Sequence, residues 1–295
     1  MEDLGNNVLS SDAQIIQADC LEWLENYRGD GFDLCFFDPP FNQGKDYRYF
    51  NDKIPPETYW IWLESILKLT HRHTNEGGAI YFMQREKNTE AVLKALRHSG
   101  WEYQNLIIWK KKTSAIPSEI RFGKQYQIIA FATKGKRPRV FNRLRINPPL
   151  PVEYKQDRNN GVYVTDIWDD IRELTSGYFA GDEALRDENG DRMHIQQSPV
   201  SLLLRILLSS TMPGDLIFDP FAGSGTTLIV AKQLGRKSIG VEIDPVNCNI
   251  VNTRKENIRP ADSIGKFRKE YVYSKDLNKI WVKNEFKKAN LILKG

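Results

Sequence analysis

An aspartate followed by two prolines and a phenylalanine, Asp38-Pro39-Pro40-Phe41, comes directly after the apolar run FDLCFF (32–37). The prolines fix φ at about −65° and hold the backbone extended, so the carboxylate of Asp38 and the carbonyl of Pro39 can face one point. Two adjacent acceptors suit an exocyclic NH₂ group, which has two hydrogens to donate, and Phe41 offers a flat face to an aromatic base. The alternative is a strand-end turn, in which Asp38 caps a neighbour and Phe41 belongs to the core.

A glycine turn in the run LIFDPFAGSGTT (216–227) is the second candidate site. Gly223 and Gly225 can adopt positive φ and have no Cβ, and the first amides of the following helix point at whatever occupies the turn. Glu242, 17 residues after Gly225, ends the next apolar run, where an adenosine-type cofactor presents its ribose hydroxyls. Leu228 replaces the third glycine of a dinucleotide fingerprint, and no phosphate-binding lysine follows, which disfavours NAD and ATP. A GxG by itself is also compatible with a purely structural turn.

Alternating strands and helices are expected to position both sites. The apolar runs predict strands at Ala13–Gln17, Phe32–Phe37, Ala79–Met83, Asn105–Trp109, Gln127–Thr133, Leu216–Phe218 and Ser238–Ile243. Helical spacing predicts helices at Cys20–Tyr27, Pro56–His73, Asn88–His98, Pro199–Met212 and Thr226–Leu234, with Ser198 as N-cap of the fourth. This alternation indicates an α/β fold with a doubly wound, mostly parallel sheet and helices on both faces. The stretch 145–193 has little periodicity and is expected to form loops and short elements.

The distribution of charge points to a polyanionic partner. The chain has 295 residues, 40% hydrophobic and 27% charged, with a net charge of only +4. The stretch from Lys110 to Arg145 contains eleven basic residues and one acidic residue. The tail from Arg254 contains twelve basic and five acidic residues. Such blocks favour nucleic acid, because basic side chains on phosphates release counterions; a solvated basic face is the alternative.

Other classes of protein are disfavoured. The three cysteines form no CxxC pair, which argues against a zinc ribbon and a secreted disulfide scaffold and favours a reducing, cytoplasmic setting. No apolar run reaches the length of a membrane helix, and the first residues lack the features of a signal peptide. His71 and His73 lie two apart on a predicted helix, on different faces, so no metal site is expected.

Taken in order, these motifs resemble those of the amino-group DNA methyltransferases that use S-adenosylmethionine, in the group whose catalytic region precedes the cofactor loop (β-type motif order). The resemblance extends over 13–257 and is weakest in the middle insert. The matching pieces are Asp19-Cys20-Leu21, Asp38-Pro39-Pro40-Phe41, Gly77–Tyr81 (GGAIY), Ile108–Lys110 (IWK), Asp166–Trp168 (DIW), His194–Pro199 (HIQQSP) and Asp219–Thr227 (DPFAGSGTT). The sequence departs from the family at Ile195, Gln196 and Ser198, where members often have proline, threonine and lysine, at Phe41, which is usually tyrosine, and at Gln125-Tyr126, where a His-Glu pair is common.

The resemblance implies a seven-stranded, Rossmann-like methyltransferase fold with an inserted target-recognition region. The expected regions are a catalytic half (1–145), the insert (146–193), a cofactor-binding half (194–260) and a basic extension (261–295). The implied catalytic residues are Asp38, Pro39, Pro40 and Phe41. The implied cofactor-binding residues are Asp19, Cys20, Asp38, Gln197, Ser198, Asp219, Phe221, Ala222, Gly223, Ser224, Gly225, Thr226, Glu242 and Ile243. Phosphate contacts are expected from Lys110, Lys111, Lys112, Arg121, Lys124, Lys136, Arg137, Arg139 and Arg143.

The implied reaction is direct transfer of the methyl group of S-adenosylmethionine to the exocyclic amine of a base flipped out of double-stranded DNA. In this family an aspartate at the first tetrapeptide position usually accompanies adenine N6, so Asp38 favours adenine over cytosine N4. Methylation at cytosine C5 is disfavoured, because the chain has no Pro-Cys dipeptide for the nucleophile. The remaining alternatives are an RNA or protein amide methyltransferase and an inactive DNA-binding relative. DNA binding implies association with the nucleoid, and a second copy of the chain and a restriction endonuclease are further candidate partners.

Overall fold

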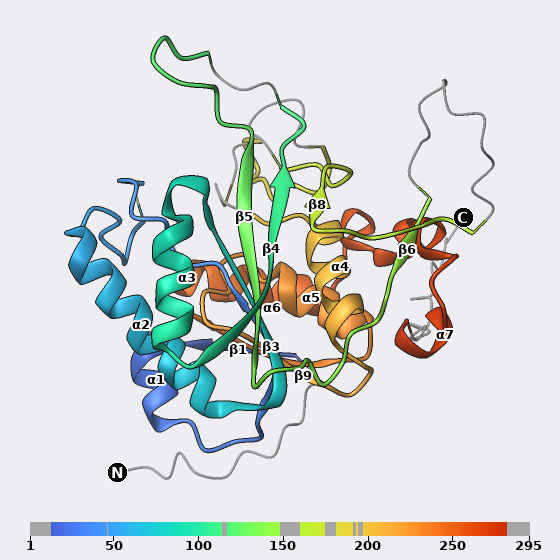
Figure 1. Ribbon diagram of the computed structural model, residues 1–295, viewed down its shortest axis with the longest axis horizontal. Coiled ribbons are helices and arrows are strands. Elements are labelled where there is room, and N and C mark those ends of the chain that lie inside the picture. The colour runs from blue at the N-terminus through green and yellow to red at the C-terminus, as the bar shows by residue number, and fades with distance from the viewer. Residues whose placement is uncertain are drawn as a thin grey trace, which may run out of the picture.

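A computed structural model of the chain describes residues 13–45, 47–113, 117–147, 160–174, 181–190, 193 and 197–281. In this described part, eight strands form one sheet in the order β1-β10-β9-β2-β3-β5-β4-β8 (Figure 1). The pairs from β1 to β3 are parallel, the pairs β3·β5 and β4·β5 are antiparallel, and β4·β8 is parallel. In sheet order the strands are β1 (Ala13–Gln17), β10 (Lys237–Glu242), β9 (Leu216–Asp219), β2 (Phe32–Phe37), β3 (Thr74–Arg85), β5 (Tyr126–Lys134), β4 (Trp101–Lys110) and β8 (Ile167–Trp168).

Helices cover both faces of the sheet, because its central strands are apolar on both sides. In β2, Leu34 and Phe36 pack into one core, while Phe32, Cys35 and Phe37 pack into the other. The second core includes side chains of α1 (Cys20–Asn26), α2 (Pro56–His73) and α3 (Thr89–His98). The first core is covered by α4 (Val200–Ser210) and α5 (Thr226–Gln233), while α6 (Pro245–Glu256) packs against β1, β10 and α5. Figure 1 shows α1 to α3 on one side of the strands and α4 on the other.

The shorter elements lie at the periphery. A two-stranded sheet joins β6 (Arg145–Ile146) to β7 (Val162–Tyr163). A single turn of 3₁₀ helix, η1 (Glu86–Asn88), joins β3 to α3, and after α6 come two 3₁₀ segments and a last short helix: η3 (Pro260–Asp262), η4 (Ile264–Tyr271) and α7 (Leu277–Ile280). No helix in the described ranges is long and apolar enough to span a bilayer.

The doubly wound, mostly parallel sheet agrees with the sequence prediction, with differences at several boundaries. Strand β3 begins at Thr74, five residues before the predicted start, because Gly77 adopts φ +73 and lets the strand continue through an irregular register with β2. The insert adds β8 to the sheet edge as an eighth strand. Ser198 is not the cap of α4: Pro199 holds that position without a side-chain hydrogen bond.

Because β1, β2, β9 and β10 are parallel, their carboxyl ends meet at one edge of the sheet. Asp38 follows β2, Asp219 ends β9, and Glu242 ends β10. In open α/β sheets ligands bind outside this edge.

Candidate active site

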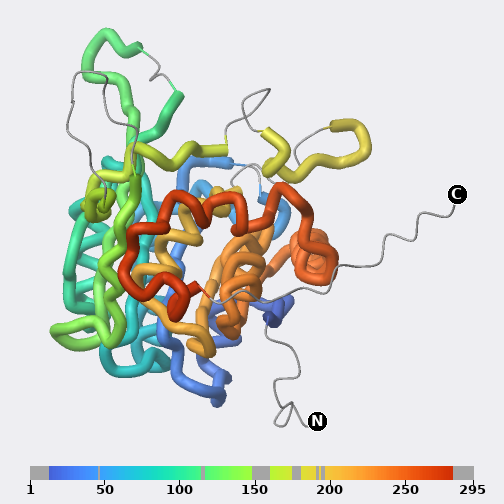
Figure 2. Tube along the Cα trace, turned by 90° about the vertical axis from the view of Figure 1, so that its right-hand side faces the viewer, coloured from blue at the N-terminus to red at the C-terminus, as the bar shows by residue number. Residues whose placement is uncertain are grey.

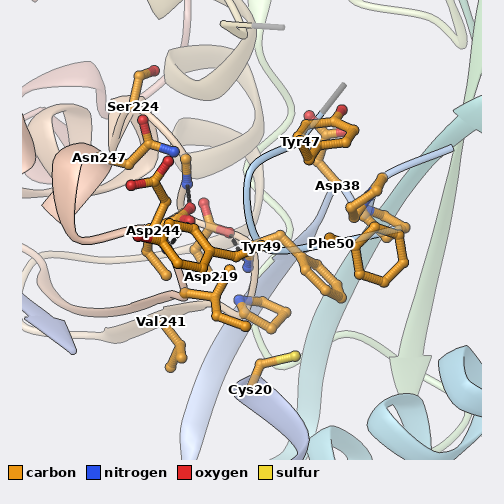
Figure 3. Close-up of a pocket in the computed structure, with 18 of the residues that line it drawn as sticks. Cys20, Asp38, Tyr47, Tyr49, Phe50, Asp219, Ser224, Val241, Asp244 and Asn247 are labelled. Atoms are coloured by element: carbon orange, nitrogen blue, oxygen red, sulfur yellow. Dashed lines mark hydrogen bonds between the residues drawn. The ribbon is translucent and has the colours of Figure 1, made fainter. Parts of the chain in front are cut away.

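A pocket lies at the carboxyl edge of the sheet and brings together the two motifs that the sequence singled out (Figure 3). Asp38, Pro39 and Pro40 form one part of its wall, and the glycine turn after Asp219 forms another. The start of α1 contributes Ala18, Asp19 and Cys20, and the end of β10 contributes Val241 to Asp244. Residues 160 positions apart in the chain therefore share one cavity, as in the contact from the Ser198 hydroxyl to Asp38 Oδ2 at 3.3 Å.

Hydrogen bonds from backbone N–H groups to a side-chain carboxylate fix the glycine turn. Glu242 holds it from the neighbouring strand: one carboxylate oxygen accepts the N–H of Gly223 at 2.7 Å and the other accepts the N–H of Asp244 at 2.8 Å. Gly223 and Gly225 have φ +49 and +76, conformations that favour glycine. Gly225 does not line the pocket; a Cβ there would meet Val251 of α6 at 2.6 Å, so this glycine permits close packing of the turn on that helix.

Carboxylates dominate the lining of this pocket. Asp19, Asp38, Asp219, Glu242 and Asp244 all contribute, whereas Arg48 is the only basic side chain among the described residues that line it. Burial, and then the charge of Asp219, raise the pKa of Asp38 to about 8. Burial raises the pKa of Asp219 to about 7, with the charge of Glu242 as a smaller cause, and burial also raises the pKa of Glu242. Such a pocket favours a cationic ligand and disfavours phosphate.

Aromatic side chains form a further part of the wall, and of these the sequence predicted only Phe221. Tyr47, Tyr49 and Phe50 come from the loop between β2 and α2, and Phe50 stacks on Trp62 of α2 with ring centroids 5.0 Å apart. Trp62 in turn meets Phe221 edge-on at 5.7 Å. The sequence signal was the run YRYF (47–50), which follows the Asp-Pro-Pro-Phe corner closely.

The carboxylate of Asp52 orders this aromatic loop from within. It accepts the backbone N–H groups of Asn42 at 2.6 Å, Gln43 at 3.1 Å and Lys45 at 3.0 Å. The side chain of Asn42 adds a pair of hydrogen bonds with the backbone of Ile54, at 2.8 and 2.9 Å. Asp52 is only 2% exposed, so the loop closes on a buried acceptor.

A second pocket adjoins the first, and Asp38 and Ser198 line both. Its apolar lining comes from Phe41, Met83, Trp109 and Leu174. Its polar and charged lining comes from Gln43, Lys45, Arg85, Glu86, Lys111, Thr113, Lys124, Tyr126, Gln127, Glu173 and Gln197. Asp38 therefore lies where the two cavities meet, with Phe41 on the side of the second.

Polar contacts behind the proline corner hold it in place. The hydroxyl of Tyr59, on α2, donates to the carbonyl of Pro40 at 2.6 Å, and Gln84 of β3 donates to that hydroxyl at 2.9 Å. Tyr59 and Gln84 are both buried. Because the corner is anchored from two elements, Asp38 is presented without further ordering when a ligand binds.

The insert contributes to the second pocket through Glu173. Its carboxylate accepts the backbone N–H groups of Lys112 at 2.8 Å and Thr113 at 2.9 Å, and the Thr113 hydroxyl also donates to it. The bonds to Lys112 and Thr113 lower the pKa of Glu173 despite its burial. The acidity of this part of the insert therefore serves to fix the end of β4, including Lys111, at the pocket.

Most of the predicted cofactor residues line the first pocket, with two exceptions. Gly225 packs on α6, as described above, and Gln197 lines the second pocket instead. The amide of Gln197 is used within the insert: its oxygen accepts the N–H of Leu185 at 3.0 Å and its nitrogen donates to the carbonyl of Glu183 at 2.9 Å. The preceding residues of the HIQQSP motif, 194–196, lie outside the described residues.

The basic stretch does not form one face. Lys111 and Lys124 line the second pocket, and Lys110, Lys112 and Arg121 belong to the same end of β4 and its connection to β5. Because β5 runs antiparallel to β3, Lys136, Arg137 and Arg139 follow it at the opposite end of the sheet. There Arg139 pairs with Asp33 at 3.2 Å and Asp215 at 2.5 Å, while the Arg143 guanidinium lies over the ring of Tyr163, 4.3 Å from its centroid.

The described part of the basic tail is also used internally. Arg254 pairs with buried Asp262 at 2.8 Å and donates to the carbonyl of Ser224 in the glycine turn. Arg259 pairs with the same aspartate at 2.8 Å. Arg254 thus supports the glycine turn. A count of charges in the sequence cannot distinguish such a residue from a cation on the surface.

His71 and His73 make contacts within the fold. His71 packs edge-on against Trp101, and His73 lies 3.0 Å from the carbonyl of Leu24. The three cysteines are free and buried. Within the described ranges, no group of three or more His, Cys, Asp or Glu side chains is arranged to hold a metal ion.

The chain is similar to known DNA methylases and methyltransferases. The model of a DNA methylase family (N6_N4_Mtase) matches residues 32–253. The chain is 30% identical over 247 residues to the DNA adenine methyltransferase YhdJ of Escherichia coli (strain K12), covering 78% of each chain. It is 28% identical to the type II methyltransferase M.HinfI of Haemophilus influenzae over 83% of this chain and 69% of that protein.

Solved structures share the fold. The PvuII DNA methyltransferase, specific for cytosine N4, matches with a TM-score of 0.63 and 18% identity over 85% of this chain and 89% of that chain. The complex of M1.HpyAVI with SAM matches with a TM-score of 0.56 and 22% identity over 82% of this chain and 98% of that chain.

Proposed function

The chain belongs to the DNA methylase family whose model it matches, and from this premise we propose that it transfers a methyl group from S-adenosylmethionine to adenine N6 in double-stranded DNA. The observation that carries the proposal is the position of Asp38 between two pockets. One pocket contains the glycine turn and would hold the cofactor. The other contains Phe41 and Trp109 and would hold the extruded base.

The lining of the first pocket suits S-adenosylmethionine in its chemistry and in its charge. Glu242 ends the strand beside the glycine turn, where its carboxylate can accept the ribose hydroxyls, and Trp62, Phe221 and the aromatic loop offer flat apolar surface for the adenine. The five carboxylates of the lining complement the positive sulfonium and ammonium groups. When bound, the cofactor supplies an electrophilic methyl group on a positively charged sulfur.

The proline corner would orient the target amine. The carboxylate of Asp38 and the carbonyl of Pro39 accept its two hydrogens, which favours a pyramidal nitrogen whose lone pair points toward the first pocket. The base stacks on Phe41, offsetting part of the cost of leaving the duplex. With a pKa raised to about 8, Asp38 can also take up the proton that the amine loses after transfer.

Adenine is preferred to cytosine because Asp38 stands at the first position of the tetrapeptide. The comparisons include both an adenine enzyme and a cytosine-N4 enzyme, so the target base requires a direct test. We expect that DNA from a host expressing the protein, sequenced with direct detection of modified bases, contains N6-methyladenine at one recurring sequence. N4-methylcytosine there would replace the proposed target, and the Asp38→Ala protein serves as the control that should leave the DNA unmodified.

The choice of polymer can be tested in parallel. Methyl transfer from labelled S-adenosylmethionine should modify duplex DNA and leave RNA and protein extract unlabelled. Labelling of RNA or protein alone would contradict the proposal. A homodimer, a partner restriction endonuclease and association with the nucleoid remain predictions from the family resemblance.

A further inference from the structure

The connection between β4 and β5, residues 111–125, is a long loop without regular structure in its described part. Figures 1 and 2 show the tip of this loop projecting from the rest of the molecule. Loops of this length are uncommon in compact domains and usually have a function.

The tip of this loop presents two large apolar side chains to solvent. Ile120 is 92% exposed and Phe122 is 98% exposed. Basic residues accompany them: Arg121 lies between them and is exposed, and Lys124 follows. Two apolar side chains with a cation between them suit a ligand that combines a negatively charged surface with an apolar interior, and stacked bases between phosphate backbones have that combination.

The two ends of the loop form part of the rim of the second pocket. Lys111 and Thr113 line the pocket from the first end, and Lys124 and Tyr126 line it from the second. Lys124 is fixed there by an ion pair with Glu86. The tip therefore stands beyond the mouth of the cavity that would receive the extruded base, on the side from which the duplex must approach.

We propose that Ile120 and Phe122 enter the base stack of the duplex as a wedge, occupying the space that the target base leaves, while Arg121 contacts the phosphates. The inference rests on the proposed function, because it requires a base to be extruded into the second pocket. Extrusion loses the stacking and pairing of that base, and an apolar side chain inserted into the gap restores stacking contact. The loop would then promote extrusion and take no part in the chemical step.

The test compares two duplexes that differ only in the cost of extrusion. One carries the methylated sequence, identified by sequencing, fully paired; the other has a mismatch opposite the target base. The Ile120→Ala/Phe122→Ala double variant should lose at least about tenfold in methyl-transfer rate on the paired duplex. On the mismatched duplex it should return to within about threefold of the wild type, because a mismatched base is extruded at lower cost.

Matched variants separate a wedge from other roles. Ile61→Ala removes an exposed apolar side chain from α2 and should change neither rate. Arg121→Ala should weaken transfer to both duplexes equally, with a shallower dependence on salt. Unchanged binding of S-adenosylmethionine in calorimetry verifies that the double variant is folded.

An unchanged rate of the double variant on the paired duplex, or an equal loss on both duplexes, would overturn the wedge. An equal loss would instead indicate a general binding surface. Failure of the wild type to methylate either duplex would refute the proposed function itself, a result distinct from failure of the wedge alone.

Discussion

At the scale of single residues, Glu242 does two jobs with one carboxylate. Its oxygens already accept the N–H groups of Gly223 and Asp244, and each oxygen has a further lone pair to offer a ribose hydroxyl. Glu242→Gln should therefore weaken binding of S-adenosylmethionine by about ten- to a hundredfold, since hydrogen bonds to a charged group are the stronger kind.

Calorimetry on purified protein measures the effect of Glu242→Gln, and Asp244→Asn is the matched control. That change also removes a carboxylate from the pocket but keeps an oxygen to cap α6. Equal losses in the two variants would mean that total charge, and not the position of Glu242, determines affinity.

Asp38 is expected to reduce stability in order to serve chemistry. Its pKa is raised from 3.8 to about 8 in the folded protein, so the unfolded state loses this proton first. The folded state is therefore penalised progressively as pH rises from about 4 to about 8, and fully above that. Asp38→Asn removes the penalty, while the Asn oxygen can still accept from Ser198.

The melting temperature of Asp38→Asn should exceed that of the wild type at pH 9, and the difference should shrink at pH 5. Thermal unfolding followed by circular dichroism checks this, with the exposed Asp30→Asn as control. A variant less stable than the wild type at pH 9 would show that the carboxylate of Asp38 is well solvated or compensated.

At the scale of elements, the loop between β2 and α2 depends on Asp52. Three backbone N–H groups converge on it, and the loop they define carries Tyr47, Tyr49 and Phe50 to the first pocket. Asp52→Ala should raise the KM for S-adenosylmethionine by about tenfold with a smaller change in kcat, because one carboxylate–amide bond contributes about 1.5–3 kcal/mol.

Asp52→Asn should restore part of the cofactor affinity, because its amide oxygen still accepts hydrogen bonds. Asn51→Ala, on the same loop, is the control, since that side chain accepts only the N–H of Lys53 in the described structure. A parallel fall in kcat and melting temperature with no change in KM would assign Asp52 to stability alone.

The elements that sequence predicted best are those buried on both faces or strongly periodic. Strand β2 and helix α2 have the predicted bounds because an apolar run and a helical stripe with a leading proline are local signals. Strand β3 was predicted too short, since its first residues, TNEGG, are polar and the strand continues only through the positive φ of Gly77. The two-residue strand β8 has no local signal, because its pairing with β4 is the only feature that defines it.

In the candidate site, too, the sequence predicted only the features that have a local signal. Asp38 and the glycine turn carry their geometry in neighbouring residues, and the sequence was sufficient to predict both motifs. The hydrogen bonds that Asp52 accepts reach back up to ten positions in the chain. No periodic pattern in the sequence marks these contacts, so the sequence did not predict them. The separation of the basic stretch into two groups at opposite ends of the sheet has no local signal, because the direction of β5 follows from its pairing with β3.

In the molecule as a whole, the negative electrostatic potential of the first pocket favours a cofactor with positive charge. Asp38 and Asp219 have pKa values raised to about 8 and about 7. As pH falls through this range both carboxyls take up protons and the pocket loses negative charge, so a cationic ligand binds more weakly. Binding of the cation should correspondingly release protons.

We therefore expect the affinity for S-adenosylmethionine to rise by about tenfold or more between pH 6 and pH 8.5. S-adenosylhomocysteine, whose sulfur is neutral, should show a smaller dependence. Calorimetry at several pH values, in buffers of different ionisation enthalpy, measures both affinity and proton release. An affinity that is the same at both ends of this range would contradict the electrostatic account.

In this mechanism, methyl transfer depends above all on the position of Asp38 where the two pockets meet. Labelled methyl transfer to duplex DNA is measured for wild type and Asp38→Ala at a cofactor concentration that saturates both proteins by calorimetry. We predict transfer by the wild type and none above background by the variant, because the amine loses its side-chain acceptor while the cofactor pocket keeps its glycine turn and Glu242. Turnover by Asp38→Ala comparable to that of the wild type would contradict the central claim.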